Sequence, residues 1–437
     1  MKRTLMITGA AVTLACSNPT LATNWLQVQG NEPADAPLFK PFGFLQPTYT
    51  RIDAEPVTGL AGGAAAYNGQ DQVANLVGPD LDADAKFQFF RARLGARGVL
   101  SPLSDKINYF VLAEGGRNAI TAEHDLMVTD ASLTFNFIPG ARIRAGLFKV
   151  PTGEEALVAV HTSYPYVYFT GMSENLLVER QLAPSTAAGA APAGLAKADI
   201  TSGGSGFRDV GIQLYDWFNT GPWELSYAAM LSNGESIDRL GDRDGNKDLT
   251  LRLQASYIFG GKGPNRDDLS LYVWRQDGER RFGTEDYDRL REGAGFMFRK
   301  ASYRVSGEYM HGKGMILNGP NPPFVDAPFH GVGLEEEARG WYLEGGWRFH
   351  PKWELDLRHE RFDRMTETAA NEREFTTTTL GLQYFINPDT RVTVNYELRD
   401  AEVSNPQAIP AGPNRDNALK IADNLGDRLS VQLTWKF

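Results

Sequence analysis

The sequence has few of the residues from which most catalytic and redox centres are built. Its 437 residues include one cysteine, Cys16, and six histidines, and no two histidines have H-x-x-x-H spacing. Cys16 lies in an apolar segment near the N-terminus, so a chain that loses this segment has no cysteine. Disulfide bonds, thiolate metal sites and haem bound through C-x-x-C-H are then excluded. No Gly-rich phosphate loop follows a strand and opens a helix, and no Ser, His and Asp can be combined into a triad from their spacing.

The chain also lacks a long hydrophobic run. No apolar stretch reaches the roughly 18 residues that a membrane-spanning helix needs, and the mean hydropathy is −0.35. A helical membrane protein is therefore excluded. A membrane barrel is not, because its strands alternate and average to a polar composition. Glycine, with 45 residues, and aromatic residues, at 11%, are abundant, which suits a sheet protein with many turns.

The N-terminus has the features of a secretory signal peptide. Two basic residues precede the apolar run 5–15, and Thr20 and Ala22 supply the small residues of a cleavage site. We expect cleavage after Ala22, so that 1–22 is the signal peptide and 23–38 is a short periplasmic segment. The loss of two basic residues and no acid changes the formal net charge from −10 to −12.

Cys16 offers an alternative to simple cleavage. Leu14 and Ala15 before it and Ser17 after it resemble the site at which a lipoprotein cysteine is acylated. The leucine that usually stands three residues before such a cysteine is Thr13 here, so lipidation of Cys16 stays an open alternative.

From residue 37 on, the chain repeats an alternating strand, a short turn, a second alternating strand and a longer polar loop. Gly, Pro, Asn and Asp dominate the short turns, because they supply the backbone dihedrals that tight reversals need. Seven such turns lie at 101–105, 138–141, 219–222, 260–267, 299–300, 350–352 and 387–389. They join fourteen strands in pairs, and the unpaired strands 39–51 and 426–437 bring the number to sixteen.

Eight longer connections alternate with these turns. They lie at 52–84, 119–126, 151–206, 234–247, 280–290, 314–337, 365–374 and 402–425. Short turns at one end, long loops at the other and an even number of strands are typical of a bacterial outer-membrane barrel, whereas β-sandwiches mix loop lengths at both ends. The sequence therefore predicts an all-β fold, a closed transmembrane antiparallel barrel of 16 strands over 39–437. A barrel of this width encloses an aqueous channel.

The last strand, 426–437, shows the alternation clearly. One face carries Leu429, Val431, Leu433, Trp435 and Phe437, and the other carries Arg428, Ser430, Gln432, Thr434 and Lys436. A final strand that ends on an aromatic residue resembles the C-terminus of bacterial outer-membrane barrels. We expect the apolar face to contact lipid or a neighbouring protomer and the polar face to contact water in the pore or at its periplasmic rim. Phe437 should lie at the short-turn end.

The longest connection, 151–206, divides into two parts. The first, 151–182, carries aromatic and apolar residues that need a surface to pack on, and the inner wall of a wide barrel offers one. We predict that this part folds into the lumen and narrows the pore. The second part, 183–206, is rich in Ala, Gly, Ser and Pro, and we predict that it is mobile.

Part of the chain resembles a known family. Residues 146–155, GLFKVPTGEE, are similar to the G-x-F-K-x-P-F-G-x-E motif of the phosphate-selective porin O/P family. Residues 91–116 resemble that family's R-R-A-R-L-G-x-x-G segment, and 162–163 with 179–180 resemble its T-S…E-R stretch. The resemblance implies a trimeric outer-membrane porin of sixteen strands that lets small hydrophilic solutes diffuse passively, without a cofactor.

Two departures limit what the resemblance implies. Thr152 replaces the usual phenylalanine of the motif, and the constriction loop 151–206 carries five acids against Arg180 and Lys197. Without the lysine cluster of the family, phosphate specificity is not implied.

The alternation of the strands places many arginines on the lumenal face. The pore-lining candidates are Arg91, Arg93, Arg97, Arg142, Arg144, Arg252, Arg304, Arg348 and Arg358, and the constriction loop adds Glu154, Glu155 and Arg180. Rings of charge at a constriction set ion selectivity, but such arginines can also pair across neighbouring strands and reinforce the wall. The predicted outer loops 52–84 and 314–337 are acidic, and a negative mouth concentrates cations.

The sign of ion selectivity therefore stays open. The family resemblance and the arginine excess of the lumen favour anions, such as phosphate or other oxyanions. The alternative is a cation-preferring or non-selective pore.

One loop resembles a metal site. Asp242, Asp244, Asn246 and Asp248 match the first half of a calcium loop, with oxygen ligands at alternate positions and a glycine for the bend. The bidentate glutamate that should follow is absent, since Leu253 stands there, and an ordinary hairpin loop explains the residues equally well. Apart from this calcium candidate, no cofactor is expected.

Two other classes of function compete with a porin. A barrel enzyme such as an outer-membrane lipase or protease needs a Ser/His or Asp/His site on outward-facing strands or at the rim, and the sequence shows none. A structural sheath around an electron-carrying protein needs a haem-bearing partner, because this chain has no haem motif. The expected partners are outer-membrane lipid, two further copies of the chain and small hydrophilic solutes or ions, with no nucleic acid.

Overall fold

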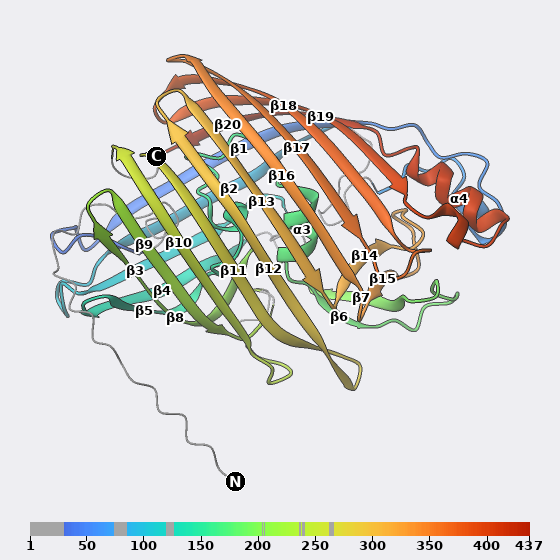
Figure 1. The fold of residues 1–437 in the computed structure, drawn as a ribbon, viewed down its shortest axis with the longest axis horizontal. Helices are drawn as coiled ribbons and strands as arrows, with labels where there is room; N and C mark the ends of the chain where they lie inside the picture. The colour runs from blue at the N-terminus through green and yellow to red at the C-terminus, as the bar shows by residue number, and fades with distance from the viewer. Residues whose placement is uncertain are drawn as a thin grey trace, which may run out of the picture.

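The computed structural model describes residues 30–73, 85–118, 126–202, 204, 206–235, 237, 241–261 and 266–437. Within them, antiparallel strands close into a single barrel in which β1 pairs with β20 (Figure 1). The barrel strands are β1 (Lys40–Asp53), β2 (Lys86–Val99), β3 (Ile107–Glu114), β4 (Met127–Ile138), β5 (Ala141–Lys149), β8 (Arg208–Thr220), β9 (Trp223–Ser232), β10 (Asp248–Gly260), β11 (Asp267–Phe282), β12 (Glu285–Lys300), β13 (Tyr303–Lys313), β16 (Glu337–His350), β17 (Trp353–Arg364), β18 (Arg373–Asn387), β19 (Thr390–Val403) and β20 (Asp427–Lys436). The predicted 16-stranded barrel is confirmed. No helix of the described residues is both long and apolar enough to cross a membrane.

The N-terminal segment packs against the short-turn end of the barrel. Glu32 forms an ion pair with Arg97, and the side chain of Asn108 donates a hydrogen bond to the carbonyl of Glu32 at 2.8 Å. The expected signal peptide 1–22, with Cys16, and residues 23–29 lie outside the described residues.

The short turns predicted from the sequence join the barrel strands in pairs, as expected. Gly140 and Gly221 adopt positive φ angles of 76° and 58° in two of these turns, a region that residues with a Cβ rarely enter. The turn predicted at 299–300 lies slightly later, because β12 continues to Lys300 and the chain reverses at 301–302.

One predicted long loop, 280–290, is wrong. β11 and β12 continue through this region, and only Gly283 and Thr284 separate them. Beyond the apolar belt both faces of these strands are polar, and on the outer face Arg281 pairs with Asp286 at 2.9 Å. The alternation of apolar and polar residues is therefore lost in 280–290, although β11 and β12 continue through it. For this reason the sequence pattern favoured a loop there.

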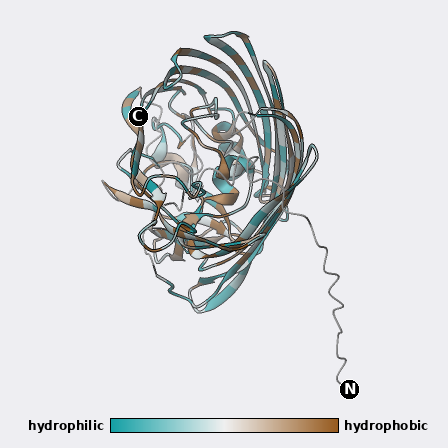
Figure 2. Ribbon diagram, turned by 90° about the vertical axis from the view of Figure 1, so that its left-hand side faces the viewer, coloured by the Kyte–Doolittle hydropathy of each residue, from teal (hydrophilic) through white to brown (hydrophobic). Residues whose placement is uncertain are grey.

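The two faces of the wall have the predicted polarity. On β10, Leu249, Leu251 and Leu253 are 48%, 46% and 60% exposed on the outside, whereas Thr250 and Arg252 between them are fully buried. On β20, Leu433, Trp435 and Phe437 are exposed, whereas Arg428, Ser430 and Gln432 are buried toward the lumen. Figure 2 shows the resulting alternation of hydrophobic and hydrophilic bands along the strands.

The last residue lies where the sequence predicted it. The Phe437 amide donates to the carbonyl of Gly43 at 3.1 Å, and the Gly43 amide donates to the carbonyl of Phe437 at 2.9 Å. Gly43 is near the beginning of β1, so Phe437 lies at the short-turn end.

The connection between β5 and β8, residues 150–207, is here called loop 3. It contains α2 (Glu154–Leu157), α3 (Gly171–Leu177), β6 (Gln181–Pro184) and β7 (Ala196–Ser202). Its first part lies inside the ring of strands, as predicted (Figure 2). Its second part was predicted to be mobile but contains regular structure instead. β6 and β7 join β14 (Ile316–Pro320) and β15 (His330–Gly333) in a four-stranded sheet, here called the lid sheet.

The lid sheet belongs to a packed cap at the long-loop end. Figure 1 places β6, β7, β14, β15 and α4 (Pro413–Ala422) at the end opposite the C-terminus. Phe324 is fully buried there among residues of the first loop, including Val57 and Leu60. Asn417 of α4 exchanges two hydrogen bonds, of 2.9 and 3.0 Å, with the backbone of Ala61. The outer loops thus hold one another in place over the barrel.

Candidate functional site: the lumen and its constriction

Loop 3 is held across the lumen by one buried glutamate of α2. The Glu155 side chain is 2% exposed and accepts hydrogen bonds from the amide of Thr170, at 3.1 and 3.2 Å, and from the hydroxyl of Tyr164. It forms an ion pair with Arg358 of β17 at 3.1 Å. Glu155 therefore ties the beginning of loop 3 to α3 and to the opposite wall.

Arg358, predicted to line the pore, is instead closed in by loop 3. It is fully buried, and besides Glu155 it donates to the hydroxyl of Tyr164 at 2.8 Å and to the carbonyl of Tyr168 at 3.2 Å. Its guanidinium also lies 4.2 Å from the centre of the Tyr166 ring. A guanidinium with this many partners holds its neighbours in place and has little freedom to meet a passing solute.

A second arginine holds the other side of α2. Arg252 of β10 is fully buried, donates to the carbonyl of Thr152 and pairs with Glu154 at 3.2 Å. The Glu154 amide donates to Glu308 of β13 at 3.0 Å. Burial raises the pKa of Glu154 to about 7, with Arg252 opposing the shift and Glu308 adding to it. Glu154 is thus a constriction-loop carboxyl that titrates near neutral pH.

The far end of loop 3 is fastened in the same manner. Arg289 and Arg291 of β12 donate to the carbonyl of Leu176, at 3.1 and 2.9 Å. Arg280 and Arg289 pair with Glu179 at 3.0 and 2.9 Å. Burial alone would raise the pKa of Glu179, but the two arginines lower it to about 2. This carboxylate stays charged at any physiological pH.

The third predicted constriction-loop residue, Arg180, is also part of this packing. Burial lowers its pKa to about 10, and it donates to the carbonyl of Val178 at 3.1 Å.

The other predicted pore-lining arginines have partners as well. These are Arg91 with Gln46 (3.0 Å), Arg93 with Glu114 (2.5 Å), Arg97 with Glu32, Arg142 with Asp216 (3.3 Å), Arg144 with Tyr215 (2.9 Å), Arg304 with Glu344 and Asp356 (2.5 and 2.7 Å), and Arg348 with the carbonyl of Pro351 (2.7 Å). Arg348 is exposed at the short-turn rim, and the others lie on the inner wall. These arginines lie at inward strand positions, and the sequence pattern did not indicate that their guanidinium groups are so widely bonded to other groups of the chain.

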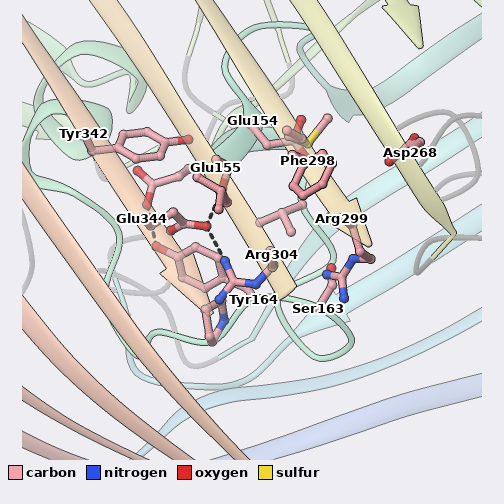
Figure 3. A pocket seen from close by; sticks show the side chains of 15 residues that line it. Glu154, Glu155, Ser163, Tyr164, Asp268, Phe298, Arg299, Arg304, Tyr342 and Glu344 are labelled. Carbon is pink, nitrogen blue, oxygen red and sulfur yellow. Dashed lines mark hydrogen bonds and ion pairs between the residues drawn. The ribbon is translucent and has the colours of Figure 1, made fainter. Parts of the chain in front are cut away.

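Open space remains on the short-turn side of loop 3. A cavity of about 60 Å³, here called the vestibule cavity, lies between α2 and strands β11, β12, β13 and β16 (Figure 3). Loop 3 contributes Glu154, Ser163 and Tyr164, and the wall contributes Arg299 and Arg304 among others.

Arg299 was missed by the sequence analysis, which assigned it to a turn. It is the penultimate residue of β12, at an inward position in phase with Arg289 and Arg291. Extending the alternation of β12 by two residues would have identified it.

The structure does not bring the four calcium candidates together. Asp248 lies in β10 with its carboxylate buried against Arg280 at 2.7 Å, and Asn246 donates to Asp286 at 3.1 Å. The remaining two, Asp242 and Asp244, lie near Glu235, with one oxygen of each within 4.8 Å of the others.

Basic neighbours compensate these acids in part. Lys247 pairs with Asp242, and Arg243 pairs with Glu235 at 3.1 Å. Calcium binding in this loop stays a prediction.

No protein-family model matches the chain, and no curated protein sequence matches it. Several solved structures share its fold. OmpF of Salmonella typhi in complex with daunomycin has a TM-score of 0.54 at 12% identity, covering 93% of this chain and 100% of its own. OprB of Pseudomonas putida has a TM-score of 0.51 at 8% identity, and the match covers 91% of this chain and 94% of OprB. The outer-membrane channel DcaP of Acinetobacter baumannii has a TM-score of 0.50 at 11% identity, and the match covers 93% of this chain and 99% of DcaP. The chain therefore has the fold of bacterial outer-membrane porins, and its closed barrel with an apolar outer face belongs in the outer membrane. The narrower resemblance to the phosphate-selective porin O/P family stays a prediction.

Proposed function

We propose that this protein is an outer-membrane porin through which small hydrophilic solutes and ions diffuse passively, without catalysis. The observation that carries the proposal is loop 3. A long segment of the chain is fixed inside a 16-stranded barrel by Arg252, Arg358 and Arg289, which narrows an otherwise wide lumen without filling it. The vestibule cavity shows that open space remains next to this constriction.

The same observation argues against a structural sheath. A sheath needs a lumen free to admit a second protein, and here loop 3 occupies the middle of the lumen. The cap at the long-loop end, built from the first, sixth and last outer loops together with β6 and β7 of loop 3, would also have to open.

For the solute, we propose a preference for anions, including phosphate and other oxyanions. Inward-facing arginines outnumber lysines on the wall, and an arginine fork matches the geometry of carboxylate and phosphate groups. A cation-preferring or non-selective pore is the alternative, because most of these arginines are paired with carboxylates or carbonyls.

Conductance in planar lipid bilayers tests the channel, and the reversal potential in a KCl gradient gives the sign of its selectivity. We expect discrete conductance steps and a reversal potential of the sign that chloride preference produces. A purified, correctly folded barrel that adds no conductance would rule out the porin function. A potential of the opposite sign, or none, would leave the porin and reject the anion preference.

We also propose that three copies assemble in the membrane, as the resemblance implies. In detergent, the protein part of the particle should have about three times the mass of one mature chain, which is slightly below the 48.2 kDa of the full sequence. Light scattering with a correction for bound detergent measures this mass, and a value near that of one chain would contradict the trimer.

A further inference from the structure

Two inward-facing strand arginines differ from all the others in the part of the chain that the structure describes. Arg299 and Arg364 form no hydrogen bond and no ion pair there, whereas every other inward strand arginine has at least one. Arg364 is 5% exposed and packs against the ring of Phe375, 5.0 Å away, under the cap. Arg299 is half-buried and opens into the vestibule cavity. Of the two, Arg299 is therefore the one that a solute can reach.

Each carboxylate that lines the vestibule cavity already has an arginine partner, although Arg266 is shared with Glu224 and Arg304 with Asp356. Four line it, and each pairs with an arginine: Glu154 with Arg252 (3.2 Å), Glu155 with Arg358 (3.1 Å), Asp268 with Arg266 (2.8 Å) and Glu344 with Arg304 (2.5 Å). None of them is within ion-pair distance of Arg299. Among the charged lining residues, Arg299 is the one without an ion pair in the described part of the chain, and Asp268, its register partner on β11, acts on it only at longer range.

The neighbouring strand places a second guanidinium beside Arg299. Arg304 is the register partner of Arg299 on β13, and its own carboxylate partners lie on β16 and β17, away from β12. Two guanidinium groups side by side repel each other, and an anion between the wall and loop 3 relieves that repulsion.

The rest of the cavity lining is neutral. Ser163 and Ser306 supply hydroxyl groups, and Tyr164, Met297 and Tyr342 supply aromatic and apolar surface (Figure 3). Such a lining accepts an uncharged body that carries hydroxyl or short apolar groups, while the guanidinium fork fits one carboxylate or phosphate group.

We infer that the vestibule cavity is a solute-binding subsite, and that Arg299 holds the anionic group of a small solute carrying one carboxylate or phosphate. The subsite lies on the short-turn side of the constriction, so a solute that has passed loop 3 stops there before it leaves the lumen. This inference rests on the proposed porin function and assigns its selectivity to Arg299, whereas the paired arginines position loop 3.

Four forms of the full-length barrel test the inference: the unaltered protein, Arg299→Ala, Arg299→Lys and Lys300→Ala. Lys300 is the next residue and faces outward, with its ammonium 5.3 Å from the Phe259 ring, so its removal costs the same charge outside the lumen. Each form is measured in planar bilayers for its chloride-to-potassium permeability ratio. Acetate and inorganic phosphate are the probes added to block the chloride current.

For Arg299→Ala, we expect the permeability ratio to fall about five-fold and the block by acetate or phosphate to weaken by a similar factor, as loss of one charge-assisted hydrogen bond implies. Arg299→Lys should keep the ratio and lose most of the block, because lysine lacks the fork. Lys300→Ala should match the unaltered protein. Block by only one of the two probes would support the subsite and identify its anion.

A ratio and a block in Arg299→Ala that equal those of Lys300→Ala would overturn the inference while conductance upholds the porin. Absence of conductance in every form would reject the porin itself. Because Arg299 has no bond to lose within the described residues, its variants should fold. A heat-modifiable band on gels checks this.

Discussion

Arg358 and Arg299 face the same lumen from neighbouring parts of the wall, but they differ in what surrounds them. Arg358 is fully buried and contacts Glu155, Tyr164 and Tyr168 of loop 3. Arg299 is half-buried and has no such partner among the described residues. The comparison teaches that an inward position gives an arginine access to the lumen only if no hydrogen bond or ion pair of the chain already holds its guanidinium. Of the four predictions that follow, the first two compare the two kinds of arginine, and the last two concern loop 3 itself.

The largest effect is expected from Arg358→Ala. Removing one partner of a buried ion pair leaves Glu155 uncompensated and costs about 3–5 kcal/mol. Loop 3 should loosen, and single-channel conductance should rise several-fold with added current noise. Arg361→Ala is the matched control, because Arg361 lies on the same strand, is 45% exposed on its side chain and points outward. Equal conductance and equal thermal stability of the two variants would show that Arg358 does not hold the loop.

A smaller effect is expected from removing three paired arginines at once. In the triple variant of Arg91, Arg93 and Arg97 to alanine, selectivity should shift toward cations, partly because Glu114 loses its partner. We expect the shift in the chloride-to-potassium ratio to be no larger than that of Arg299→Ala alone, although three charges are lost. The shift is measured from the reversal potential in a KCl gradient. A shift larger than that of Arg299→Ala would mean that the paired arginines, and not Arg299, determine the selectivity.

A pH effect of about two-fold should follow from Glu154. Its pKa of about 7 means that it is mostly protonated at pH 6 and mostly charged at pH 8. The groups that act on it are Arg252 and Lys149, which favour its charged form, and Glu308 and Asp268, which disfavour it. The chloride-to-potassium ratio should therefore fall as the pH rises through about 7.

Glu154→Gln serves as the control for this titration, because it keeps the shape of the side chain and cannot ionise. Its permeability ratio should stay flat over the same pH range. A pH dependence that persists in Glu154→Gln would assign the titration to another group.

The smallest effect is expected from locking the lid sheet. Ala198 of β7 and His330 of β15 are register partners, so Ala198→Cys with His330→Cys allows a disulfide between loop 3 and the sixth outer loop. Because the lid sheet is already paired, oxidation should leave single-channel conductance within about a tenth of its reduced value. A marked drop on oxidation, reversed by reductant, would show that the lid sheet opens during conduction.

Much of the fold followed from the sequence, because it depends on local patterns. Alternation and turn residues are readable one strand at a time, and they placed the barrel strands and Phe437. The prediction failed at 280–290, where Arg281 and Asp286 extend the strands beyond the apolar belt and alternation gives no signal. It also failed for 183–206, whose small residues contribute to β6 and β7; these strands pair with each other, and β7 pairs in turn with the distant β15.

Less of the site could be predicted, because its character depends on contacts between distant segments. The inward phase of Arg252 and Arg358 was readable from their own strands. Their partners, Glu154 and Glu155, come from loop 3, and no spacing rule connects these positions. Arg299 was missed because the sequence analysis ended β12 too early, and it is the vestibule arginine that loop 3 leaves without an ion pair among the described residues.

The lid sheet has a consequence for how the protein is made. Ala196 and Val332 pair within it, yet β8 to β13 stand between them along the chain. These strands must take their places in the wall before the two hairpins meet, since contacts between distant residues form only after the intervening chain is ordered. We therefore expect the lid sheet to be one of the last parts of the protein to form. A newly inserted barrel would pass through a stage in which its outer mouth is still open.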